Sequence, residues 1–103
     1  MVDYRQIIDK FELRPNKKLG QNFLVDGQVI DRLVNSVSSS KDLPVLEVGP
    51  GLGFLTTKLV DRFQRVLAVE VDRELYRVVK ERVISDNFKL INEVEVSNDN
   101  KEE

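Results

Sequence analysis

Apolar residues recur at helical spacing in the first forty positions of the chain. In DYRQIIDKFEL they predict a helix that ends before Pro15, because the residue before a proline avoids the helical region. Asp26 then precedes a second amphipathic run, as an N-cap residue does. The apolar positions of the two predicted helices are Tyr4, Ile7, Ile8 and Phe11, then Val29, Ile30, Leu33, Val34 and Val37. The polar stretch SSSKD that follows indicates a loop.

Strand-like and helix-like runs alternate after this loop. PVLEV (44–48) and RVLAVEV (65–71) are short apolar runs that predict buried strands. A helix is expected after each, and Asp72 is placed to cap the second. The apolar faces of these helices are Leu52, Leu55, Leu59 and Phe63, then Leu75, Val78, Val79 and Val83. FKLINEVEV (88–96) alternates apolar and polar residues at several positions and suggests a third strand.

The order of these elements predicts the fold class. Strands that alternate with helices form parallel sheets with right-handed crossovers, so we expect an α/β fold. It would have a parallel sheet of about three strands with flanking helices, preceded by two N-terminal helices. We expect one domain over residues 1–96, with the N-terminal helices in 1–40, the alternating core in 43–96 and a polar tail in 97–103.

Composition excludes several kinds of chemistry. The 103 residues are 41% hydrophobic and 33% charged, which suits a folded domain, and the net charge of −2 gives no general attraction to nucleic acid. The sequence has no cysteine and no histidine, which excludes disulfides, thiolate and imidazole catalysis and the usual zinc sites. No metal is expected. No apolar run approaches 18 residues and no signal peptide is present, so a reducing cytoplasm is the expected location and no membrane partner is expected.

Three alternate glycines, Gly49, Gly51 and Gly53, separate the first predicted strand from its helix. Such a turn lets backbone approach a ligand and points a helix N-terminus at it, although it can also serve only as a connection. Glu70 follows Gly49 by 21 positions at the end of the next strand, where a carboxylate can accept hydrogen bonds from a ribose. This spacing favours a nucleoside site over a plain connection. Glu47 either orients the loop or lies near solvent.

The spacing of the glycines decides between nucleotides. The dinucleotide pattern G-x-G-x-x-G requires a third glycine where Phe54 stands, which argues against an oxidoreductase. The pattern present, E-x-G-x-G-x-G from Glu47 to Gly53, resembles motif I of S-adenosylmethionine-dependent methyltransferases. Since this cofactor has no phosphate, the loop would admit its methionyl and ribose parts.

Three blocks together narrow the resemblance. KKLGQNFLVD, VLEVGPGLGFLTTKL and VLAVEVD are similar, in order and spacing, to the small-subunit ribosomal RNA adenine dimethyltransferase family over roughly residues 4–92. The macrolide-resistance methyltransferases of large-subunit rRNA share the QNFL block and are the second alternative. The resemblance implies a partial Rossmann-like methyltransferase fold, S-adenosylmethionine as cofactor, and small-subunit rRNA or a pre-ribosomal subunit as partner.

The resemblance also implies residue roles. Asn22 and Leu24 would close over the cofactor, Gly49 and its loop would contact the methionyl end, Glu70 the ribose, and Val71 the adenine ring. The candidate cofactor contacts are thus Asn22, Leu24, Gly49, Gly51, Gly53, Glu70 and Val71. The cations Arg14, Lys17 and Lys18 either position RNA phosphates or form a solvated cationic loop.

The chain departs from the family pattern towards its end. Val94 stands where the family has an acidic residue that contacts adenine, and Glu93 or Glu95 could replace that residue only after a small shift. The Asn-Leu-Pro-Tyr type motif, which orients the target adenine, does not occur. We therefore expect a cofactor-binding N-terminal portion, natural, engineered or from a disrupted gene, that does not methylate RNA alone. A non-catalytic cofactor- or RNA-binding module is the alternative. The exposed strand edge could pair with a second copy.

Overall fold

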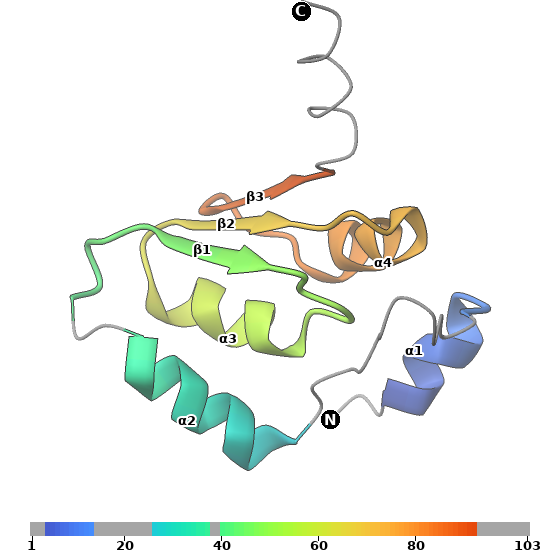
Figure 1. Ribbon diagram of the computed structural model, residues 1–103, viewed down its shortest axis with the longest axis horizontal. Coiled ribbons are helices and arrows are strands. Elements are labelled where there is room, and N and C mark those ends of the chain that lie inside the picture. The colour runs from blue at the N-terminus through green and yellow to red at the C-terminus, as the bar shows by residue number, and fades with distance from the viewer. Residues whose placement is uncertain (1–3, 14–25, 38–39, 93–103) are drawn as a thin grey trace, which may run out of the picture.

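The helices and strands follow one another in the order that the sequence predicts. The computed structural model describes residues 4–13, 26–37 and 40–92 (Figure 1). The elements are α1 (Tyr4–Lys10), α2 (Gly27–Val37), β1 (Val45–Val48), α3 (Phe54–Arg62), β2 (Val66–Val69), α4 (Arg73–Arg82) and β3 (Phe88–Ile91). The predicted α/β order is confirmed. The part of the third predicted strand from residue 93 to 96 lies outside the described residues.

The three strands form one parallel sheet in the order β1-β2-β3. Val66 of β2 lies opposite Val45 of β1 and Phe88 of β3, so the carboxyl ends of the strands meet at the same edge of the sheet. The arrowheads in Figure 1 point to this edge. The glycine loop leaves β1 there, and Glu70 directly follows β2 there. Ligands of open α/β sheets bind outside this edge.

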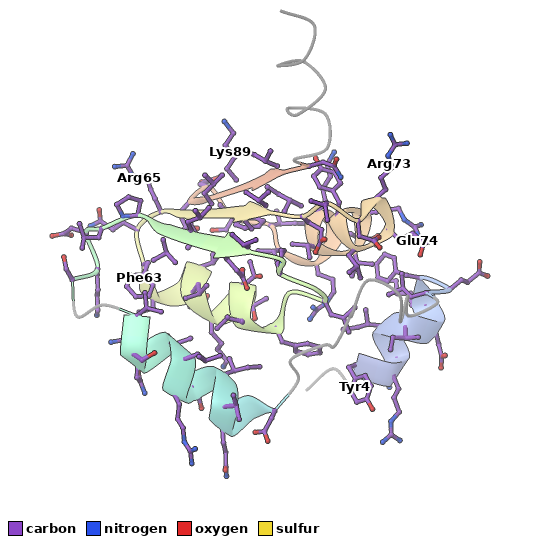
Figure 2. The ribbon with its side chains drawn as sticks, in the orientation of Figure 1. Tyr4, Phe63, Arg65, Arg73, Glu74 and Lys89 are labelled. Carbon is purple, nitrogen blue, oxygen red and sulfur yellow. The ribbon has the colours of Figure 1, made fainter. Side chains whose placement is uncertain are left out.

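The helices cover one face of the sheet. Figure 1 shows α2 and α3 on the same side of the strands. On β1, Val45 and Glu47 face this side and are buried, whereas Leu46 and Val48 face away and are 62% and 77% exposed. The labelled side chains of Arg65 and Lys89 also extend away from the helices (Figure 2). Within the described ranges, no helix covers this second face.

The core consists of two clusters of buried side chains that meet at the glycine loop. One joins α2, α3 and the first two strands, and comprises Ile30, Val34, Val45, Leu59, Phe63 and Val66. The other joins α1 and α4 to Leu52 of the loop, and comprises Ile7, Phe11, Leu13, Leu52, Leu75 and Val78. Phe54, the first residue of α3, packs against both clusters. The loop is therefore anchored by apolar side chains on either side of Gly53.

The second helix buries less of its apolar face than the sequence suggests. Ile30 and Val34 are buried, but Val29, Leu33 and Val37 are 38%, 40% and 45% exposed. α2 packs chiefly on α3, and one neighbouring helix covers only a narrow stripe. Periodicity located the helix correctly, while the width of its buried face depends on how many elements surround it.

Candidate functional site

The loop between β1 and α3 uses its three glycines for their backbone conformation. Gly49, Gly51 and Gly53 have φ values of +73°, +62° and +88°, in a region that side chains with a Cβ rarely adopt. Gly53 ends the loop as the N-cap residue of α3, and its carbonyl accepts from the Thr57 N–H at 3.0 Å. The alternation of glycines that marked this segment in the sequence therefore corresponds to a specific turn.

The first and last glycines of the loop face different surroundings. A Cβ at Gly49 would meet no atom within 4 Å, so open space lies beside the backbone there. A Cβ at Gly53 would lie 3.4 Å from Arg82 Nη1 and 3.4 Å from Val83 Cγ2. Gly49 thus leaves room for a ligand, whereas Gly53 lets the loop approach α4 closely.

Glu70 lies directly after β2 and connects the loop to the start of α4. Its side chain is 5% exposed, and its backbone N–H donates to the Ile91 carbonyl at 2.9 Å. Its two carboxylate oxygens accept from the Gly51 N–H at 3.4 Å and from the Asp72 N–H at 3.0 Å. The carboxylate therefore lies beside the glycine loop, as the 21-residue spacing indicates.

Burial raises the pKa of Glu70 above its ordinary value of 4.5. The hydrogen bonds from the Asp72 and Gly51 backbone oppose this rise, and the nearby Asp72 carboxylate adds to it. Each carboxylate oxygen has more than one lone pair, so both oxygens retain capacity to accept a further hydrogen bond. Two ligand hydroxyls are the kind of donor that such a group can bind.

Glu47 on β1 is a second buried carboxylate. It is 9% exposed and accepts from the Thr56 hydroxyl at 2.5 Å, which joins β1 to the first turn of α3 across the loop. Burial raises the pKa of Glu47, the Thr56 hydrogen bond opposes the rise, and repulsion from Glu70 adds to it. The alternative that Glu47 lies near solvent is wrong. Side chains alternate between the two faces along β1, and this alternation places Glu47 on the face that the helices cover.

Asp72 organises the start of α4 beside Glu70. Its side chain accepts from the Glu74 N–H at 2.8 Å and the Leu75 N–H at 3.1 Å, which is the predicted N-cap. Val71, between the two acids, is 55% exposed and accessible to a ligand. The other sequence candidates, Asn22, Leu24, Arg14, Lys17 and Lys18, lie outside the described residues.

Sequence reasoning missed three residues near this edge. Thr56 is the partner of Glu47, and Arg82 donates from the end of α4 to the carbonyl of Leu52 in the loop. Asn92, directly after β3, has a buried Oδ1 with no hydrogen-bond partner in the part of the chain that the structure describes. Arg82 is 30 positions from Leu52, and no local pattern relates them.

Two surface hollows lined by described residues lie away from the glycine loop. One of about 360 Å³ lies between the end of α4 and β3, and one of about 330 Å³ lies near the amino ends of β2 and β3. Neither is lined by loop residues.

In the described segments, no helix is long and apolar enough to cross a membrane, and no group of three His, Cys, Asp or Glu side chains could hold a metal. The loop and Glu70 remain the candidate site.

Comparison with known proteins shows which sequences this chain resembles. Residues 12–98 match the family described as ribosomal RNA adenine dimethylase. Ribosomal RNA small subunit methyltransferase A of Clostridium acetobutylicum is 41% identical over 88 residues, which are 84% of this chain and 32% of that protein. The chain therefore spans about a third of the length of this curated relative.

Solved structures show the same fold. The 23S rRNA methyltransferase ErmE has a TM-score of 0.64 and 39% identity, over 69% of this chain and 30% of that chain. A dimethyladenosine transferase from Plasmodium falciparum has a TM-score of 0.62 and 25% identity, over 67% of this chain and 27% of that chain. The expected partial methyltransferase fold is confirmed.

Proposed function

Because the chain belongs to the ribosomal RNA adenine dimethylase family, we propose that it is the cofactor-binding portion of an enzyme that methylates rRNA adenines. The cofactor would be S-adenosylmethionine. The observation that carries the proposal is the buried Glu70 carboxylate, which is linked to a loop of three positive-φ glycines at the carboxyl edge of the sheet. This edge is where α/β sheets bind nucleotides.

The geometry supports a proposal in which different residues contact different parts of the cofactor. The open space beside Gly49 would take the methionyl part, because backbone can approach a ligand closely there. Glu70 would accept from the ribose hydroxyls, and the exposed Val71 would contact the adenine ring. Gly51 and Gly53 would shape the loop, while Asn22 and Leu24 would close the site from the N-terminal side.

The proposed substrate of the complete enzyme is adenine in small-subunit rRNA. The similarity to a small subunit methyltransferase over 84% of the chain supports this choice. Action on large-subunit rRNA is the alternative, favoured by the 39% identity with ErmE over 69% of the chain. Arg14, Lys17 and Lys18 would contact RNA phosphates, whose negative charge attracts such clusters. A cytoplasmic location is part of the proposal.

We expect the 103-residue chain to bind cofactor without transferring methyl groups. The sequence contains no Asn-Leu-Pro-Tyr type motif to position an acceptor adenine, and positioning supplies much of the rate of such reactions. The test is incubation of the chain with radiolabelled S-adenosylmethionine and undermethylated small subunits, with calorimetry against S-adenosylhomocysteine in parallel. Binding without transfer is expected. Label in the rRNA would contradict the inactive assignment, and absence of binding would contradict the cofactor site.

Self-association is a further part of the proposal. β1 is an edge strand of the described sheet, and its outward side chains Leu46 and Val48 are exposed. A strand edge with apolar neighbours is a template for pairing with another chain. A second copy could therefore pair along β1.

A further inference from the structure

The glycine loop after β1 depends on contacts from outside itself for its shape. Glycine loses more conformational freedom on folding than any other residue, so a turn with three glycines has little intrinsic preference for one geometry. Inside the loop, the Gly53 N–H donates to the Pro50 carbonyl at 3.0 Å. Glu70 holds the loop at Gly51 on one side. The side towards α4 is held by a different residue.

Arg82, the last residue of α4, contacts Leu52 and Phe54 and lies close to Gly53 between them. Its Nη1 donates to the Leu52 carbonyl. The same nitrogen would lie 3.4 Å from a Cβ at Gly53, and the guanidinium carbon lies 4.7 Å from the centre of the Phe54 ring. A planar guanidinium can donate in its plane and stack with its face, so one side chain satisfies both contacts.

A second arginine on the same helix makes similar contacts with a different segment. Arg77 donates through Nη2 to the Phe11 carbonyl at 3.3 Å, and its guanidinium lies 5.6 Å from the Phe11 ring. Phe11 follows α1 and lies outside the glycine loop. α4 therefore carries two arginines with matched chemistry, and only Arg82 contacts the loop.

We propose that Arg82 is a positioning residue that holds the glycine loop in one geometry. Through this side chain, α4 sets the affinity for cofactor without contributing a cofactor contact. The predicted effect on cofactor affinity rests on the proposed function. The predicted effect on loop geometry does not depend on that function. Removing the guanidinium leaves the Leu52 carbonyl without its donor and the Phe54 ring without its stacked cation. The loop then samples conformations that do not match the cofactor.

The test compares Arg82→Met with Arg77→Met in the 103-residue chain, since methionine keeps part of the aliphatic stem in both. Amide hydrogen exchange of the ligand-free protein, followed by NMR, should be about tenfold faster at Gly53 in Arg82→Met and unchanged there in Arg77→Met. The Kd for S-adenosylhomocysteine should rise about tenfold in Arg82→Met and less than about twofold in Arg77→Met. Melting temperatures report any general loss of stability.

Arg82→Lys keeps the charge and a donor nitrogen but loses the planar guanidinium, so it should have an intermediate effect. It replaces Arg82→Met should that variant not fold. Equal effects of the two arginine substitutions on the Gly53 amide and on the Kd would overturn the inference, as would unchanged exchange in Arg82→Met. A wild-type chain that does not bind S-adenosylhomocysteine would contradict the proposed function instead. The exchange comparison would then still decide whether Arg82 positions the loop.

Discussion

At the scale of single residues, the site is dominated by two buried carboxylates with different partners. Glu47 bonds to the Thr56 side chain, whereas Glu70 accepts from the backbone of Gly51 and Asp72. Backbone donors hold a carboxylate in place while leaving lone pairs free, which suits a ligand contact. The Thr56 side chain that bonds to Glu47 lies on the face of the sheet that the helices cover, which suits a structural role for Glu47. These partners favour the ligand contact proposed above for Glu70, and a supporting role in the loop for Glu47.

Replacing Glu70 with alanine should weaken cofactor binding. Hydrogen bonds to a charged group contribute roughly 1.5–3 kcal/mol, so the Kd for S-adenosylhomocysteine should rise by about tenfold to a hundredfold. Calorimetry measures this, with Glu74→Ala as the control because Glu74 is an exposed acid in the first turn of α4. Similar Kd values for the wild type and Glu70→Ala would remove Glu70 from the site.

Replacing Glu47 with glutamine should change how stability depends on pH. Burial raises the pKa of Glu47 above 4.5, so the folded state binds its proton more tightly than the unfolded state does. Above pH 4.5 the unfolded chain releases this proton first, and stability falls as pH rises towards the folded pKa. Glu47→Gln lacks this fall and can still accept from Thr56.

Urea unfolding at pH 4.5 and at neutral pH measures the difference. Glu47→Gln should gain stability relative to the wild type as pH rises through this range. Asp61→Asn is the control, because Asp61 is exposed on α3. A stability difference between Glu47→Gln and the wild type that does not vary with pH would show that burial of Glu47 has no energetic effect.

At the scale of elements, a local sequence signal correctly placed the start of α4 beside Glu70. Asp72 starts α4 and its N–H donates to Glu70. The end of α1 shows the opposite case, because the sequence assigned it to Pro15. The helix ends instead at Lys10, where Glu12 adopts a φ of +54° and the Leu13 N–H donates to the Ile8 carbonyl at 2.9 Å. This is a Schellman motif built without glycine, which sequence patterns rarely reveal.

Removing the cap of α4 should lower the stability of the folded chain. Asp72→Ala loses the acceptor for two backbone N–H groups and should cost about 1 kcal/mol, or about 4–8 °C in melting temperature. Asp72→Asn retains an acceptor and should lose less. Thermal unfolding followed by circular dichroism distinguishes the two. Equal melting temperatures for Asp72→Ala and the wild type would mean that the cap contributes nothing to stability.

At the scale of the whole molecule, the described chain is a two-layer arrangement with one sheet face uncovered. Helices lie on one side, and the other side presents Leu46 and Val48 at the edge strand β1 (Figure 1). Large contiguous apolar patches on a surface favour association. Val29, Leu33 and Val37 of α2 are further exposed apolar side chains, on an element separate from the sheet.

The double substitution Leu46→Lys and Val48→Lys should reduce self-association of the chain. Charged side chains on an edge strand oppose pairing, and both positions are already exposed, so folding should be preserved. Sedimentation velocity across a concentration series measures the assembly, with Ile84→Lys as a control at an apolar position that is 87% exposed outside the sheet. A wild type that is monomeric at all concentrations would refute the proposed pairing.

The sequence by itself determined the order of the elements and that Glu70 lies beside the glycine loop. Glycine spacing, apolar periodicity, the Asp72 cap and the position of Glu70 are local features, and each reflects the conformation or burial of a few neighbouring residues. The tertiary structure alone decided that Glu47 is buried, that three of the five apolar positions of α2 are exposed and that Arg82 holds the loop. These outcomes depend on which distant segments pack together, and no local pattern encodes the surroundings that a side chain meets after the chain has folded.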